Sequence, residues 1–251
     1  MSSRPLTGRT ALVTGASRGI GRAIVEKFAE LGCEVLAGVR TPNLNLSAEF
    51  TRLASEHQTK ITEVHVDLSN AEKGAACANY IAASNNIHIL VNNAGIANGS
   101  TFQMTKISEF REVFEVNFFA TVAFTQPISR RMTRLSEGSI INLGSTAGLN
   151  GDTGTSSYGS SKAALMYLTK VMALELGEAG IRVNAVAPTI TETDMLDQMS
   201  GVARNALIQG GAIRRPSTPR EIANVVAFLA SPESSMITGQ IFRVDGGQRG
   251  R

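Results

Sequence analysis

Tyr158 and Lys162 stand four positions apart in the stretch SSYGSSKAALMYLTK, residues 156–170. Residues at i and i+4 lie on one face of a helix, so the phenol and the ammonium would point the same way. A free tyrosine has a pKa of about 10, too high for proton exchange near neutrality, whereas a nearby ammonium favours the phenolate. The pair is therefore either a surface contact or a proton donor with its activator.

A glycine-rich stretch, ALVTGASRGIGRAIV, connects an apolar run to a helical pattern near the start of the chain. Gly15, Gly19 and Gly21 would let the backbone turn tightly and approach a pyrophosphate. The negative charge of that group is favoured at the N-terminal end of a helix. The spacing differs from G-x-G-x-x-G, and tight turns need glycine in any case. We interpret the stretch as a candidate dinucleotide loop.

The end of the second predicted strand bears on the choice of dinucleotide. An acidic residue at that point accepts hydrogen bonds from the adenosine ribose and selects NAD. In the run LAGVR, Val39 stands in that place and Arg40 follows. Arg40 and Arg18 could bind a 2′-phosphate through charge-assisted hydrogen bonds, or they could be two surface arginines. The missing acid favours NADP(H) over NAD(H).

Apolar runs that alternate with longer amphipathic segments must position these residues. Strands separated by helices imply right-handed βαβ crossovers and a parallel sheet covered on both faces. We therefore predict an α/β fold, a single-domain Rossmann-type doubly wound parallel sheet over residues 1–251. The predicted strands, seven in number, lie near residues 10–14, 34–39, 61–66, 87–91, 139–143, 181–187 and 240–244. The predicted helices lie near residues 20–31, 47–57, 70–84, 107–134, 157–178 and 219–230.

One segment, at about residues 189–215, interrupts this alternation. It is longer than a typical α/β connection and follows the sixth predicted strand. The carboxyl edge of a parallel sheet is where a substrate wall or lid would lie, so we interpret the segment as a substrate-loop insertion. Two short packing helices without such a role are the alternative. Its apolar residues are Met195, Leu196, Met199, Leu207 and Ile208.

Charge and composition exclude several classes of protein. The net charge of +3 is not clustered enough to suggest nucleic-acid binding, and no run of about 20 apolar residues suggests a membrane span. The three histidines, His57, His65 and His88, have no ligand spacing, so no metal site is expected. Cys33 and Cys77 form no metal or disulfide pattern, which fits a reducing cytoplasm.

Taken together, the chain resembles the short-chain dehydrogenase/reductase family over essentially its whole length. The C-terminal run ITGQIFRVDGG also looks like the final strand of that family. The order and spacing of the matching features make the resemblance specific. They are TGASRGIG (14–21), Asp67, NNAG (92–95), Asn117, Ser145, and Tyr158 with Lys162.

The resemblance implies a catalytic role for four residues. Tyr158 would be the acid/base and Lys162 its activator, which also hydrogen-bonds the nicotinamide ribose. Ser145 would donate to the substrate carbonyl and steady the oxyanion. Asn117 would hold a water that links Lys162 to solvent. Alternatively, Ser145 could be a strand-end hydroxyl that satisfies backbone groups, and Asn117 a helix residue bonded to a neighbouring strand.

The resemblance also implies contacts along the whole cofactor. Asp67 and the Leu68 amide would meet the adenine, Pro188 and Thr191 the nicotinamide carboxamide, and Thr193 the pyrophosphate. The full set of implied cofactor contacts is Gly15, Ser17, Arg18, Gly19, Ile20, Gly21, Arg40, Asp67, Leu68, Asn93, Ala94, Gly95, Tyr158, Lys162, Pro188, Thr191 and Thr193.

Within the family, the runs GSTAGLNGDTGTSSYGSSKAAL and NAVAPTITETDM look most like 3-oxoacyl-acyl-carrier-protein reductases. That likeness implies a cytoplasmic enzyme of fatty acid biosynthesis, which reduces a β-ketoacyl thioester of acyl carrier protein or CoA with NADPH. The helices near 107–134 and 157–178 are the surfaces on which relatives assemble, so a homotetramer is expected.

Two departures leave the substrate open. Thr189 follows Pro188 where relatives read glycine, and the run ELGEAG is acidic where carrier-protein enzymes often place a basic residue. Arg130, Arg131 and Arg134 are candidate docking residues for an acidic acyl carrier protein, although a solvated helix face is the favoured interpretation. The alternatives are an NADP-dependent reductase of another small, sugar or secondary-metabolite ketone and a catalytically idle dinucleotide-binding scaffold.

Overall fold

The computed structural model describes residues 4–196, 199 and 201–248. In this part of the chain, the strands form a seven-stranded sheet in the order β3-β2-β1-β4-β5-β6-β7, and every neighbouring pair is parallel. The reversal of strand order between β1 and β4 defines a doubly wound sheet, and the predicted fold class is confirmed. The strands are β1 (Thr10–Thr14), β2 (Glu34–Val39), β3 (Ile61–His65), β4 (Ile89–Asn92), β5 (Gly138–Leu143), β6 (Ile181–Pro188) and β7 (Ile241–Val244).

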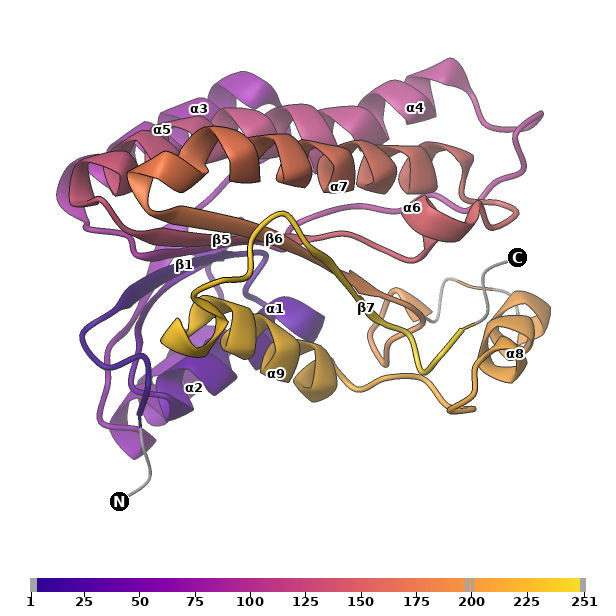
Figure 1. Ribbon diagram of the computed structural model, residues 1–251. Helices are drawn as coiled ribbons and strands as arrows, with labels where there is room; N and C mark the ends of the chain where they lie inside the picture. Colours follow the sequence, from indigo (N-terminus) through magenta and orange to yellow (C-terminus); the bar gives the residue numbers. More distant parts are fainter. Residues whose placement is uncertain (1–3, 197–198, 200, 249–251) are drawn as a thin grey trace.

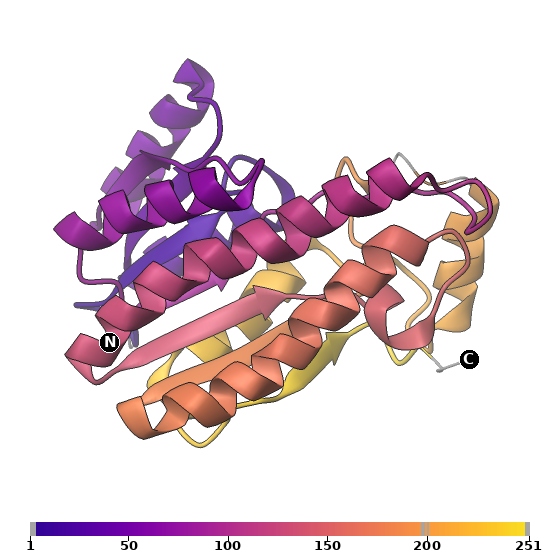
Figure 2. The same ribbon diagram turned by 90° about the horizontal axis from the view of Figure 1, so that it is seen from above.

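Helices cover both faces of the sheet (Figure 1). One layer contains α1 (Gly19–Glu30), α2 (Leu44–Glu56) and α9 (Pro219–Ala230), and the other contains α3 (Ala71–Ser84), α4 (Ile107–Phe114), α5 (Thr121–Leu135) and α7 (Ser156–Leu176). Two short helices, α6 (Ala147–Asn150) and α8 (Gly201–Gly210), follow the carboxyl ends of β5 and β6. Short helical turns lie at Gly177–Ala179 and Pro232–Ser234. Figure 2 shows α5 and α7 crossing the sheet side by side.

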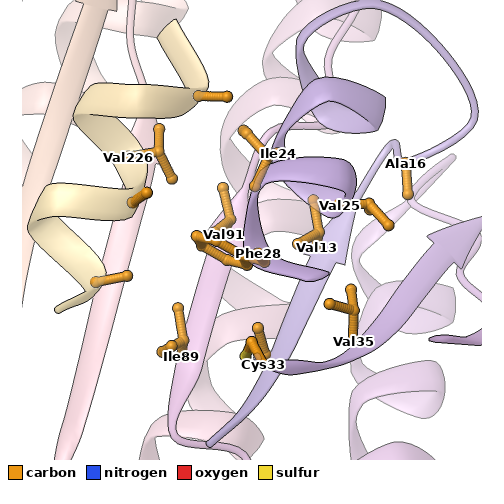
Figure 3. Close-up of a cluster of buried hydrophobic side chains, with 14 of the residues drawn as sticks. Val13, Ala16, Ile24, Val25, Phe28, Cys33, Val35, Ile89, Val91 and Val226 are labelled. Carbon is orange, nitrogen blue, oxygen red and sulfur yellow. The ribbon is translucent and has the colours of Figure 1, made fainter. Parts of the chain in front are cut away.

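A close-packed apolar core fixes the sheet against α1 and α9. Figure 3 shows Phe28 of α1 among Val91 of β4, Val13 of β1 and Val226 of α9, and all four side chains are fully buried. Burying a side chain of this size stabilises the fold by about 1.5–3 kcal/mol. Because helices cover both faces, the central strands β1 and β4 are buried along almost their whole length. The core therefore gives a rigid base to the loops at the carboxyl edge.

The opposite layer is tied to the sheet by a buried polar ladder. Asn92 and Asn142 are register partners on β4 and β5, and Asn92 Nδ2 donates to Asn142 Oδ1 at 2.8 Å. Asn92 Nδ2 also donates to Thr125 Oγ1 of α5, and Asn142 Nδ2 donates to Thr169 Oγ1 of α7, both at 2.9 Å. Buried amides are costly unless they are paired. The ladder therefore fixes α5 and α7 where the site will be built.

The structure corrects the single helix predicted over 107–134. It is divided into α4, a π-helical turn η1 (Glu115–Ala120) and α5. A single π turn widens a helix locally and is common at functional sites, but it leaves the 3.6-residue periodicity nearly intact. The helix predicted from residue 47 begins earlier, at Leu44, because the Asn43 side chain accepts from the backbone N–H groups of Asn45 and Leu46.

Of the predicted insertion at 189–215, the described residues form one regular helix, α8, preceded and followed by irregular chain. Positions 197, 198 and 200 lie outside the described residues. No side chain of α8 is buried.

Candidate active site

Helix α7 brings the half-buried Tyr158 and the buried Lys162 together at the edge of the sheet. Lys162 is only 4% exposed, and its Nζ lies 5.9 Å from the centroid of the Tyr158 ring. The same Nζ donates to the carbonyl oxygen of Leu143, the last residue of β5, at 2.8 Å. Gly159 lets α7 approach α6, because a Cβ there would lie 2.8 Å from the Ala147 carbonyl oxygen. The pair is thus held against the sheet edge, with the ammonium buried and the phenol half-buried.

Burial acts on both members of the pair. It raises the pKa of the Tyr158 hydroxyl, and a hydrogen bond with Ser145 partly opposes that shift. Burial also lowers the pKa of the Lys162 ammonium to about 8, because the charged form is poorly solvated there. At neutral pH Tyr158 is therefore a protonated phenol that can donate a proton. The Lys162 ammonium beside it has a pKa only slightly above neutrality.

Ser145 reaches the pair from the loop that follows β5. Its side chain is almost completely buried, and its Oγ accepts from the backbone N–H of Ala147 at 3.2 Å at the start of α6. With the Ser145–Tyr158 hydrogen bond and the Lys162 contact to Leu143, one strand end positions all three polar side chains. The arrangement can hold a carbonyl oxygen between two hydroxyl groups.

Asn117 lies in the π-helical turn and is fully buried. Its Oδ1 accepts from the Ile96 N–H at 2.8 Å, and its Nδ2 donates to the Ile96 carbonyl at 2.9 Å and to Ser161 Oγ at 3.1 Å. Asn117 is thus bonded to the loop that follows β4 and not to a strand. A Cβ on Gly95 would lie 3.0 Å from Asn117 Oδ1 and 3.3 Å from Lys162 Nζ, so glycine there lets this amide and the ammonium approach the loop.

The glycine-rich loop wraps closely around the start of α1. Gly15 and Gly19 adopt left-handed φ angles of +64° and +55°, which favour glycine. At Gly21 a Cβ would lie 2.2 Å from the Gly15 carbonyl oxygen and 2.5 Å from Asn93 Nδ2, so no larger residue fits. The first turn of α1 contains no acidic residue, and the Arg18 side chain does not cap it. Its N–H groups are therefore suited to an anion.

Thr14, which the sequence reasoning did not single out, joins this loop to the NNAG loop. Its Oγ1 accepts from the backbone N–H groups of Asn93 and Ala94, both at 3.0 Å. Asn93 Nδ2 in turn donates to the carbonyls of Thr14 and Gly15 at 2.9 and 3.1 Å. Ser161 was also missed; its Oγ links Asn117 to the Tyr158 carbonyl, to which it donates at 2.7 Å. A hydroxyl directly before the first glycine was the available signal for Thr14.

On the predicted adenosine side, Asp67 is firmly ionised. Its pKa falls to about 2, chiefly because Lys73 donates a hydrogen bond to it at 3.0 Å, with a further bond from the Ser69 N–H. Leu68 is buried beside it, while Arg40 is exposed at the end of β2.

The segment after β6 returns to the glycine-rich loop. The Pro188 carbonyl accepts from the Thr146 N–H at 2.9 Å, next to Ser145. Thr191 Oγ1 shares a hydrogen bond of 2.9 Å with Ser217 Oγ.

The Thr193 methyl group lies 3.1 Å from the position of a Cβ on Gly19 in the glycine-rich loop. Asp194, the next residue, forms an ion pair of 2.7 Å with Arg18 of the glycine-rich loop.

The predicted catalytic and cofactor residues therefore lie along one edge of the sheet. Arg130, Arg131 and Arg134 do not; they lie in the last turns of α5, which leads to the amino end of β5. Arg131 donates to Asn86 Oδ1 at 2.7 Å. Among the described residues no group of three or more acidic, histidine or cysteine side chains could hold a metal ion. In the same part of the chain, no helix is long and apolar enough to cross a membrane.

A family model described as enoyl-(acyl carrier protein) reductase matches residues 15–249. The chain is 37% identical over 243 residues to the 3-oxoacyl-(acyl-carrier-protein) reductase FabG of Vibrio cholerae serotype O1, which covers 96% of this chain and 98% of the relative.

Two solved structures share the whole fold. One, from Beutenbergia cavernae, is described as a candidate NAD(P)-dependent gluconate 5-dehydrogenase with bound NADP at low occupancy. It has a TM-score of 0.90 and 33% identity, over 98% of this chain and 99% of that one. The other is a 7α-hydroxysteroid dehydrogenase with NADH and 7-oxo glycochenodeoxycholic acid. It has a TM-score of 0.86 and 32% identity, over 99% and 98% of the two chains.

Proposed function

The chain belongs to the short-chain dehydrogenase/reductase family, and from this premise we propose that it reduces the ketone of a 3-oxoacyl thioester to the 3-hydroxyacyl form. The chain is an oxidoreductase that uses a nicotinamide dinucleotide. One observation carries the proposal: Tyr158, Lys162 and Ser145 meet at the carboxyl edge of the sheet that also carries the glycine-rich loop.

The residues at this edge fit a dinucleotide. The loop turns at glycines whose backbone leaves no room for a Cβ at Gly21, and the start of α1 is free of acidic side chains. Both features suit a pyrophosphate. We assign the phosphate contacts to residues 15–21 and Thr193, the adenosine contacts to Asp67, Leu68 and the NNAG loop, and the nicotinamide contacts to Pro188 and Thr191.

A reduced nicotinamide held by these residues would supply the hydride that adds to the carbonyl carbon of the substrate. The Ser145 hydroxyl donates a hydrogen bond to the carbonyl oxygen, where negative charge develops. Tyr158 then transfers its proton to this oxygen and becomes a phenolate. The Lys162 ammonium stabilises that phenolate, because an opposite charge nearby favours the ionised form. Asn117 fixes the chain beside Lys162, and we retain for it the proposed role of holding a water that returns the proton.

The preference for NADP(H) is the finer part of the proposal. Val39 at the end of β2 is buried and offers no carboxylate to a ribose, and Arg40 beside it is exposed and basic. Arg18, which forms an ion pair with Asp194, adds a second positive charge. A 2′-phosphate would thus meet two guanidinium groups and no acid at the end of β2.

The substrate class rests on relatives such as the Vibrio cholerae reductase, whose name states its reaction. We propose an acyl carrier protein or CoA thioester as the form of substrate, a homotetramer as the assembly and the cytoplasm as the location. Tyr167 and Leu174 on α7 are 70% and 84% exposed, and burial of these side chains between subunits would support the assembly. The arginines of α5 do not support binding of an acyl carrier protein near Tyr158, because they lie at the amino edge of the sheet, away from Tyr158.

A second candidate is a reductase of another ketone. Two structures of the same fold at about one-third identity act, by their descriptions, on a sugar acid and on a steroid. The test is the oxidation of NADPH and NADH with acetoacetyl-CoA beside a panel of sugar and steroid ketones. Preferential NADPH turnover with acetoacetyl-CoA supports the thioester reductase; turnover only with other ketones rejects it in favour of the second candidate.

A further inference from the structure

Thr189 carries a side chain at a position where the family resemblance leads us to expect glycine. Its Oγ1 donates to Gln248 Oε1 at 3.1 Å, although 59 positions separate the two residues. The Gln248 amide continues the contact, because its Nε2 donates to the carbonyl oxygen of Leu207 in α8 at 3.4 Å. A hydroxyl, an amide and a helix carbonyl therefore connect the end of β6 to α8.

Both ends of this connection are held by other contacts. The Thr189 N–H donates to the Val244 carbonyl at 3.2 Å, next to the loop that carries Ser145. The Gln248 carbonyl accepts from Arg243, whose guanidinium also bonds Asn150 of α6 at 3.3 Å and Asp245 at 2.6 Å. Gln248 is thus presented to Thr189 by the chain after β7.

The side chains of helix α8 give it little apolar anchoring. None of them is buried, and Figure 1 shows the helix apart from the two helical layers. Just after the helix, the Ile213 N–H donates to the Gly246 carbonyl at 2.8 Å. An element without a buried apolar face depends on its individual polar contacts, so losing one changes its position or its opening.

We propose that Thr189 and Gln248 are positioning residues that hold α8 as a wall of the keto-substrate site and thereby increase the affinity for substrate. The inference rests on the proposed function, because α8 is taken as the wall beside Ser145 and Tyr158. It assigns a role to the one residue that replaces the expected glycine at the nicotinamide end of the pocket.

The chemistry of the connection requires an amide at position 248. Only a side chain with both an acceptor and a donor can take the Thr189 hydroxyl and bond the Leu207 carbonyl at once. In Gln248→Glu the carboxylate still accepts from Thr189, but it has no donor for the carbonyl and repels it. In Thr189→Val the shape is retained and the hydroxyl is lost, whereas Thr189→Ser keeps the hydroxyl.

The experiment combines hydrogen exchange of residues 201–210 with steady-state kinetics on the full chain. In Thr189→Val and Gln248→Glu we expect amide exchange in α8 to quicken about fivefold, as the loss of one net hydrogen bond implies. We expect KM for acetoacetyl-CoA to rise about threefold to fivefold, with kcat and the NADPH dissociation constant within about twofold of wild type. Thr189→Ser should restore both readouts.

Thr51→Val is the matched control. It removes a hydroxyl that donates to Ser47 within α2, far along the chain from α8, and it should change neither readout. Unchanged amide exchange of α8 in both Thr189→Val and Gln248→Glu would contradict the proposal that these two residues hold α8 in place. Faster amide exchange with an unchanged KM would show that the contact holds α8 but does not increase the affinity for substrate. If the wild-type protein reduces no 3-oxoacyl thioester, the proposed function is wrong and so is the proposed effect on substrate affinity. The exchange measurement would still show whether Thr189 and Gln248 hold α8 in place.

Discussion

The two segments that meet at the candidate cofactor site are held in different ways. On one side, Thr14 and Asn93 join the glycine-rich loop to the NNAG loop through four hydrogen bonds, each of which uses the backbone of one loop. On the other side, the chain after β6 is held by single contacts, such as those of Thr191 with Ser217 and of Asp194 with Arg18, and it carries α8, which has no buried side chain.

This difference separates cofactor binding from substrate binding. A dinucleotide presents the same phosphates to every relative, so a loop whose backbone is fixed serves all of them. A substrate wall on a helix that has no buried side chain can change with little cost to the core. The comparison explains how one fold serves the thioester, sugar-acid and steroid relatives named above.

The largest difference between the two regions is expected when Gly21→Ala is compared with Gly201→Ala. A Cβ at Gly21 would meet the Gly15 carbonyl oxygen at 2.2 Å, whereas a Cβ at Gly201 in α8 meets nothing within 4 Å. We expect Gly21→Ala to lower the free energy of unfolding by about 3 kcal/mol and to abolish measurable NADPH binding. Gly201→Ala should change stability by less than about 1 kcal/mol.

Urea unfolding and a fluorescence titration with NADPH measure both quantities. Equal effects of the two substitutions would show that the glycine-rich loop is no more constrained than α8.

A smaller effect is expected when the bond between the two loops is removed. Thr14→Val leaves the N–H groups of Asn93 and Ala94 without their acceptor. Unpaired buried donors cost about 1–3 kcal/mol, so we expect a loss of about 2 kcal/mol and a weaker NADPH complex. Thr14→Ser, which retains the hydroxyl, is the control in the same unfolding experiment. A Thr14→Val protein as stable as wild type would remove the basis for calling this side rigid.

The smallest effect concerns pH and the catalytic pair, which lies between the two regions. Burial lowers the pKa of Lys162 to about 8, so its ammonium is present below that pH and is lost as the pH rises through it. We expect the reduction rate at saturating substrate to fall above about pH 8, by up to tenfold per pH unit. A pH–rate profile measures this.

Because Lys162 is held by the Leu143 carbonyl and not by α8, Thr189→Val should leave the midpoint of that profile in place. A midpoint that moves with Thr189→Val would mean that α8 controls the electrostatics of the pair.

Local spacing explains what could be predicted from the sequence. The alternation of apolar runs and helical patterns predicts the seven strands and the fold class, because the central strands are buried on both faces, whereas the edge strands β3 and β7 are only half-buried. Tyr158 and Lys162 are one helical turn apart, and the glycines of the loop lie within seven residues, so their proximity follows from short-range geometry.

Long-range pairing explains what was missed. The π turn at Asn117 adds one residue to a helical turn, which hydrophobic periodicity does not resolve. Thr14 acts through backbone N–H groups nearly 80 positions away, and Thr189 acts through Gln248. Hydroxyl side chains of this kind look the same in sequence whether they face solvent or join two loops.

The most direct test of the central claim is Tyr158→Phe, assayed for NADPH binding and for turnover in parallel. The substitution removes the hydroxyl that would protonate the substrate oxygen and leaves the ring, the Lys162 contact to Leu143 and the glycine-rich loop in place. We predict an NADPH dissociation constant within about threefold of wild type and a fall in turnover of at least about a thousandfold. Turnover close to that of wild type would contradict the account.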